Sequence, residues 1–114
     1  MDPLLDPDIV GDFDYLSRKQ GRDVFAEMIG RLTLSWPQRL DEIQQARAAG
    51  STQALSRALH ALKGTAAALG LCQLAAGAAK AEQLAQNGVL DIDLAELSSL
   101  VERSLAAARA YRRD

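Results

Sequence analysis

Apolar side chains recur every three or four positions along almost the whole chain, and this spacing restricts its fold more than any other feature. Such spacing gathers apolar residues on one face of an α-helix, whereas a strand needs alternation with a period of two, which is not evident here. Ala and Leu are abundant and aromatic residues make up only 4% of the chain, which favours helix over sheet. We therefore expect an all-α protein.

Breaking and capping residues divide this pattern into five predicted helices. They cover Asp6–Arg18, Arg22–Ala49, Gln53–Leu69, Leu71–Gln86 and a fifth segment that opens at Asp93. Either Ser51 or Thr52 serves as the N-cap of the third helix, and Pro37 is expected to kink or locally split the second. Because short connections join long helices, we expect an antiparallel four-helix bundle with a short additional N-terminal helix.

Length and charge limit the function classes. The chain of 114 residues suits a single domain, 1–114, either as a stand-alone protein or as part of a larger one. Its net charge is −2 and charges of both signs are interspersed, which argues against nucleic-acid binding. The short basic cluster Arg109–Arg113 is interpreted as a solvated helix end.

The cysteine and histidine content and the hydropathy of the chain argue against further classes of site and protein. Cys72 is the only cysteine and His60 the only histidine, so neither an internal disulfide nor a Cys/His metal site is expected. No apolar run approaches the roughly 18 residues that span a bilayer. We therefore expect no direct membrane insertion and a cytoplasmic location.

His60 lies in the middle of the third predicted helix, away from its core face. At about 100° per residue, one arc of that helix collects six apolar side chains, those of Leu55, Ala58, Leu59, Leu62, Ala66 and Leu69. His60 falls nearly opposite the centre of this arc. It is therefore expected to be exposed to solvent and not a core histidine, which leaves an ordinary surface histidine as the alternative.

The neighbours of His60 favour a functional role. Ser56 and Gly64 lie one turn before and after it, and Ala67 lies two turns after, so these small residues leave the imidazole accessible to a docking partner. Gly64 costs a helix about 1 kcal/mol relative to Ala. Lys63, at i+3, can bring its ammonium near a phosphoryl group carried by the imidazole. The alternatives are a tolerated glycine and an ordinary solvated lysine.

The segment HALKGTAAALG, from His60 to Gly70, resembles the signature of histidine-containing phosphotransfer domains. That signature has a His-x-Leu-Lys-Gly core and a second glycine six residues on. The resemblance covers most of the chain, from Leu16 to the Asn87-Gly88 turn, and includes Glu82 in the fourth helix. Its departures, such as Gly77 inside the fourth helix, are expected to affect packing and partner choice more than chemistry.

The resemblance implies a four-helix bundle in which His60 is phosphorylated and Lys63 assists the phosphoryl group. Gly64 would leave room for that group, and Gly70 would end the helix. The chain would accept a phosphoryl group from the aspartate of one receiver domain and pass it to that of another, as in bacterial two-component phosphorelays. The receiver would bind Mg²⁺, and no cofactor is expected on this chain.

The sequence contains no P-loop or kinase-type glycine loop, so no ATP binding or autokinase activity of its own is expected. The domain could still belong in cis to a hybrid sensor kinase that tethers it to the inner membrane. Three alternatives remain: a phosphotransfer-like bundle that acts only as an interaction module, a plain helical adaptor, and the phosphoacceptor domain of a sensor kinase. The last typically has an acidic residue after the histidine, where this chain has Ala61. The sequence does not predict the donor, the acceptor or the signal.

Overall fold

The computed structural model describes residues 3–111, so Arg112 and Arg113 of the predicted basic cluster lie outside the described residues. Its five helices are α1 (Pro7–Gln20), α2 (Val24–Ala48), α3 (Thr52–Ala68), α4 (Cys72–Gln86) and α5 (Leu94–Ala110). No strand occurs between residues 3 and 111. The all-α prediction, including the additional N-terminal helix, is confirmed.

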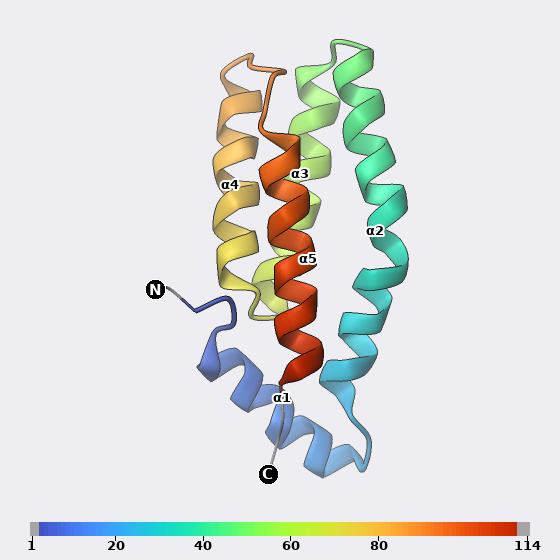
Figure 1. Ribbon diagram of the computed structural model, residues 1–114, viewed down its shortest axis with the longest axis vertical. Coiled ribbons are helices and arrows are strands. Elements are labelled where there is room, and N and C mark those ends of the chain that lie inside the picture. The colour runs from blue at the N-terminus through green and yellow to red at the C-terminus, as the bar shows by residue number, and fades with distance from the viewer. Residues whose placement is uncertain (1–2, 112–114) are drawn as a thin grey trace.

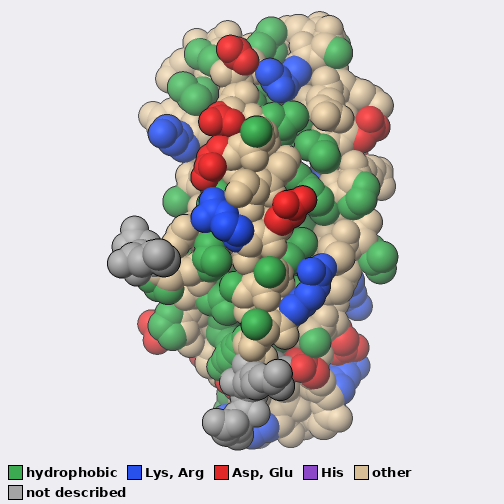
Figure 2. Space-filling view, viewed as in Figure 1, with side chains coloured by type: hydrophobic (Ala, Val, Ile, Leu, Met, Phe, Trp, Pro, Cys, Tyr) green, Lys and Arg blue, Asp and Glu red, His purple; other side chains and the backbone are tan. Residues whose placement is uncertain are grey.

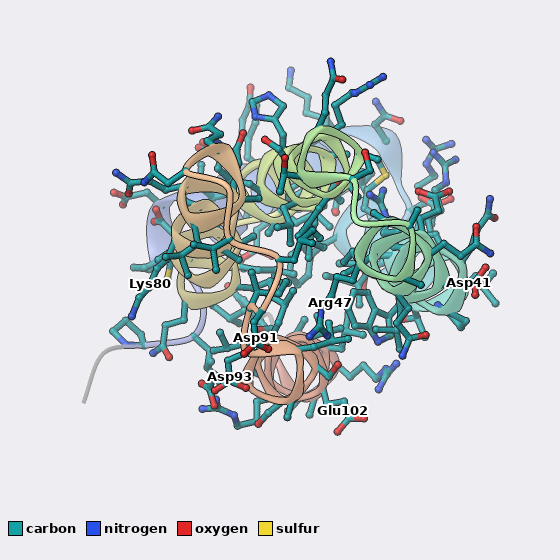
Figure 3. All side chains as sticks on the ribbon, turned by 90° about the horizontal axis from the view of Figure 1, so that it is seen from above. Asp41, Arg47, Lys80, Asp91, Asp93 and Glu102 are labelled. Atoms are coloured by element: carbon teal, nitrogen blue, oxygen red, sulfur yellow. The ribbon has the colours of Figure 1, made fainter. Side chains whose placement is uncertain are left out.

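Helices α2 to α5 form an elongated bundle in which each helix runs antiparallel to the next (Figure 1). Helix α1 lies across one end of this bundle and packs mainly against α2. The most extensive contact joins α3 and α4, and α5 packs against α4 and α2. Consequently α3 and α5 occupy opposite sides of the bundle, as the view along its axis shows (Figure 3).

Side-chain caps and left-handed glycines set the helix ends. The Ser51 hydroxyl accepts a hydrogen bond from the amide of Ala54 at 3.1 Å, so Ser51 is the N-cap of α3. Asp93 caps α5 in the same way, through the amide of Glu96 at 2.9 Å. Gly70 has φ 73°, and a Cβ there would lie 2.9 Å from Cβ of Ile9, so both its backbone and its surroundings favour glycine.

Helix α2 continues through Pro37, so the expected local split is wrong. Proline removes one backbone hydrogen bond from a helix interior, but apolar contacts on both sides of it hold the two halves together. Leu32 and Ile43 belong to the buried core, and Trp36 packs against that core. Tertiary packing therefore outweighs the local penalty.

The apolar core lies between the four long helices. The predicted core face of α3 is confirmed for Leu55, Leu59, Leu62, Ala66 and Leu69, which are all buried, while Ala58 is half-buried. In α1, Val10 is buried but Leu16 is 38% exposed. The apolar pattern of α1 therefore includes residues, such as Leu16, that do not pack against the bundle.

Polar contacts fix both ends of the bundle. At the α1 end, the amide of Asp6 donates to the Gly70 carbonyl at 2.7 Å, and the Tyr111 hydroxyl donates to Asp14 at 2.7 Å. At the other end, Arg47 of α2 donates to the Leu90 carbonyl at 3.0 Å and pairs with Asp91 at 3.3 Å. Figure 3 shows Arg47 directed toward Asp91 in the α4–α5 connection. These contacts hold the helices in register.

Charges of both signs are scattered among hydrophobic side chains on the face shown in Figure 2. None of the helices described here combines the length and apolarity required to cross a membrane.

Candidate functional site

His60 projects from the middle of α3, with 67% of its side chain exposed. The predicted solvent exposure is therefore confirmed. The ring is nevertheless anchored, because its Nδ1 lies 2.8 Å from Oε2 of Glu82 on the neighbouring helix α4. Because Nδ1 is fixed by this hydrogen bond, the Nε2 side of the exposed imidazole faces an approaching partner in a defined orientation.

Glu82 is a buried carboxylate that joins two residues of α3. Its side chain is only 9% exposed, and its second oxygen, Oε1, lies 2.9 Å from Nζ of Lys63. One carboxylate thus contacts His60 and Lys63 with different oxygens. Burying a carboxylate is costly unless it is paired and hydrogen-bonded, and here both oxygens have partners.

The pKa of Glu82 is lowered from its usual value of 4.5. The largest cause is the hydrogen bond from Lys63, and the hydrogen bond from His60 and the charges of both partners act in the same direction, whereas burial opposes them. Glu82 is therefore ionised at neutral pH.

The ionised carboxylate assigns the tautomer of a neutral His60. A carboxylate can only accept hydrogen bonds, so the proton between the two groups belongs to Nδ1 of the imidazole. The lone pair of the neutral ring is then on Nε2, which has no hydrogen-bond partner within residues 3–111. The arrangement therefore directs the nucleophilic nitrogen away from Glu82.

The predicted neighbours of His60 lie as their helical spacing implies. Gly64 and Ala67 are exposed and Ser56 is half-buried. A Cβ added at Gly64 would meet no heavy atom within 4 Å, so packing does not explain this glycine. Lys63 is directly paired with Glu82, and its assistance to a phosphoryl group stays a prediction.

Glu82 is the site residue that the sequence analysis did not single out. It lies four residues after Ala78 and three before Ala85, both buried, so its place on the apolar face of the fourth helix was readable from the sequence. An acidic residue on a buried face needs a cationic partner. That requirement was the available signal, but the sequence alone does not show that α3 supplies the partner.

Within the described part of the chain, no group of three or more His, Cys, Asp and Glu side chains is placed to hold a metal ion. The chemical groups assembled here are one imidazole, one ammonium and one carboxylate. Together they can present a nucleophile and support a change of charge on it.

Comparison with known protein families gives a match. The model of the family described as Hpt domain matches residues 27–111, which include the whole of α3 and α4. Helix α1 and the first residues of α2 precede the matched segment. No curated protein and no solved structure matches the chain.

Proposed function

Because the chain belongs to the Hpt domain family, whose members transfer phosphoryl groups in phosphorelays, we propose that it is a phosphorelay intermediate with His60 as the phosphorylated residue. It accepts a phosphoryl group from a receiver-domain aspartate and passes it to the aspartate of another receiver domain. The observation that carries the proposal is the exposed imidazole of His60 with Nδ1 held 2.8 Å from the buried Glu82.

The hydrogen bond to Glu82 suits the chemistry of transfer. The lone pair on Nε2 attacks the phosphorus of the aspartyl phosphate, a new N–P bond forms, and the P–O bond to the aspartate breaks with its electron pair staying on the carboxylate. The imidazole ring gains positive charge in this step while Nδ1 keeps its proton. The Glu82 carboxylate, already at hydrogen-bond distance, offsets that charge.

This chain and the receiver domain supply different chemical groups to the transfer. The bundle presents and orients the imidazole, while the receiver supplies the aspartate, the Mg²⁺ and most of the stabilisation of the transferring group. In the onward transfer, the aspartate of the second receiver attacks the phosphorus, a P–O bond forms, and the N–P bond to His60 breaks. The open surface at Gly64, with nothing within 4 Å of an added Cβ, supports close approach by a receiver domain.

A transfer assay with radiolabelled receiver domains tests this function. A panel of receivers is phosphorylated with a small-molecule phosphodonor, mixed with this chain, and the label is followed onto the chain and then onto a second receiver. We expect label that is acid-labile and stable in base, as phosphohistidine is. The matched control is His60→Gln, because its amide can still donate to Glu82 while lacking the nucleophile.

The same assay separates this proposal from a bundle that only binds a partner. An interaction module would bind a receiver without becoming labelled. Acid-stable label, label that persists in His60→Gln, or no transfer from any receiver would each contradict the proposed function. Circular dichroism should show equal helical content in both proteins, because the side chain of His60 is 67% exposed.

A further inference from the structure

A groove between α2 and α3 lies to one side of the helix face that carries His60. Its volume is about 380 Å³, and its lining includes apolar side chains of both helices, those of Met28, Leu32, Ala68 and Leu69. Two arginines of α2, Arg31 and Arg39, also line it. The groove thus combines an apolar surface with positive charge and contains no acidic lining residue.

Arg39 is held in place by hydroxyl groups from both helices. Its Nε donates to the hydroxyl of Ser35 at 3.1 Å, and its Nη2 donates to the hydroxyl of Thr65 at 3.3 Å. Neutral partners orient the guanidinium without neutralising it. A preorganised arginine loses less side-chain entropy when it pairs with a carboxylate.

Neither groove arginine has a carboxylate partner within residues 3–111. Arg31 makes only a 3.8 Å contact with the sulfur of Met28, and Arg39 contacts the two hydroxyl groups alone. Among the other described arginines, Arg22, Arg47 and Arg103 form ion pairs, whereas Arg18, Arg57 and Arg109 do not. Arg31 and Arg39 differ from these last three in lining one apolar groove together. The groove therefore concentrates positive charge that the described fold does not neutralise, although the whole chain has a net charge of −2.

The groove is within reach of a protein that contacts His60. Thr65 and Ala68 follow His60 by five and eight residues, which at 1.5 Å per residue is about 8 to 12 Å along the helix axis. Ala68 is rotated by roughly 80° from His60 around α3, toward α2. A standard interface covers about 800 Å² of each partner, and such an area, centred on His60, extends over this part of the groove.

We propose that this groove is a second contact site for the receiver domain and selects among receivers. The inference rests on the proposed function. The matching receiver surface has an apolar side chain that enters the groove and flanking Asp or Glu carboxylates that pair with Arg31 and Arg39. Transfer at His60 then depends on the groove through docking, whereas the chemical step at the imidazole does not.

The test measures single-turnover transfer against receiver concentration, with the phosphorylated receiver that transfers fastest to the wild-type chain. The variants are Arg31→Glu, Arg39→Glu and the double variant, and Arg18→Glu on α1 is the matched control with the same change of net charge. Arg31 is exposed and contacts only the sulfur of Met28, so Arg31→Glu keeps the test valid if Arg39→Glu disturbs folding. Thermal melting confirms the fold of each protein.

We expect the double variant to raise the half-saturating receiver concentration about tenfold, since it removes two charge contacts and adds repulsion. The transfer rate at saturation should change less than about twofold. Lys substitutions of the partner carboxylates in the receiver should restore docking to the Glu variants. Arg18→Glu should leave both quantities unchanged.

Several outcomes would overturn the groove contact. The first is a half-saturating receiver concentration that does not change in the double variant. The second is an Arg18→Glu variant that raises this concentration as much as the groove variants do. The third is a double variant in which only the transfer rate at saturation falls. Sedimentation that shows a wild-type dimer dissociated by Arg39→Glu would assign the groove to a second copy of the chain instead. If no receiver transfers to the wild-type chain, the proposed function fails as well, whereas wild-type transfer with unaffected variants contradicts only the groove.

Discussion

The Nδ1 of His60 and the Oε2 of Glu82 lie 2.8 Å apart although the residues belong to different helices and are 22 positions apart in the chain. The exposed ring is therefore oriented by a buried group, and that group is in turn paired with Lys63. An imidazole on an isolated helix would lack this orientation. The packing of α3 against α4 thus determines how the imidazole is presented.

We predict that Glu82→Ala slows phosphoryl transfer about tenfold, because one charge-assisted hydrogen bond to the ring is worth on the order of 1.4 kcal/mol. Glu82→Gln should be slowed less, since its carbonyl oxygen can still accept from Nδ1. Single-turnover transfer from one receiver measures both. Gln83→Ala, at the exposed neighbouring position, is the control, and transfer by Glu82→Ala at the wild-type rate would contradict the role of the carboxylate.

The lowered pKa of Glu82 predicts a stability change in acid. Because its folded-state pKa lies below the unfolded value, Glu82 contributes stability that is present above the usual 4.5 and lost as pH falls through the folded pKa. Urea unfolding of the wild type and of Glu82→Gln should therefore differ most near neutral pH. The difference in the free energy of unfolding should shrink as the pH falls below 4.5, and a pH-independent difference would argue against this ion pair.

Lys63 tests charge at the site. We expect Lys63→Ala to slow transfer about fivefold to tenfold, consistent with a partly exposed charge-assisted contact of about 1 kcal/mol. Lys63→Arg should retain part of the activity, and Lys63→Glu should be the slowest because a second carboxylate would face Glu82. Lys80→Ala, at an exposed position on α4, is the control. Equal rates for all variants would remove Lys63 from the site.

Gly64 tests access to His60. Gly64→Leu and Gly30→Leu both add a Cβ at a position where it meets no atom of a neighbouring element within 4 Å, and both should stabilise their helices by roughly 1 kcal/mol. Only Gly64→Leu should block transfer, because only this residue lies one turn from His60. Transfer kinetics and thermal melting, measured together, separate access from packing. Normal transfer by Gly64→Leu would exclude this position from the docking surface.

Ser104 predicts a stabilising substitution away from the site. Its side chain is fully buried in α5, and its hydroxyl has no hydrogen-bond partner among the described residues. Ser104→Ala removes this unsatisfied group and should raise the free energy of unfolding by about 1 kcal/mol. Ser98→Ala, half-buried on the same helix, controls for helix propensity. Equal gains in denaturant unfolding would indicate that the Ser104 hydroxyl is satisfied.

The fold was predictable because its determinants are local. Apolar periodicity and caps such as Asp93 predicted the start of each of the five helices, and the end of the first four, to within two residues. The exposure of His60 followed from its position opposite the core face of α3. Pro37 was expected to kink or locally split the second helix, and the split does not occur, because local rules do not include the packing that holds α2 together on both sides of it.

The site was less predictable because it joins two helices. His60 and Lys63 are neighbours on α3 and could be considered together, whereas the contact of either with Glu82 depends on the register of α4 against α3. The unpaired state of Arg31 and Arg39 is also a property of the assembled bundle. Periodicity gives the face of each residue but not the atom that it meets on the next helix.

The contacts of Glu82 with His60 and Lys63 also make the site sensitive to the position of α4 relative to α3. His60 and Lys63 lie three residues apart on α3, so a slip of α4 by one residue, about 1.5 Å along its axis, cannot preserve both contacts of the Glu82 carboxylate. A slip away from His60 lengthens and weakens its hydrogen bond to Glu82. The Nδ1 proton of His60 should then exchange faster with solvent and lose its downfield NMR resonance. That single proton can report whether a variant or a bound partner has shifted the bundle, even when helical content is unchanged.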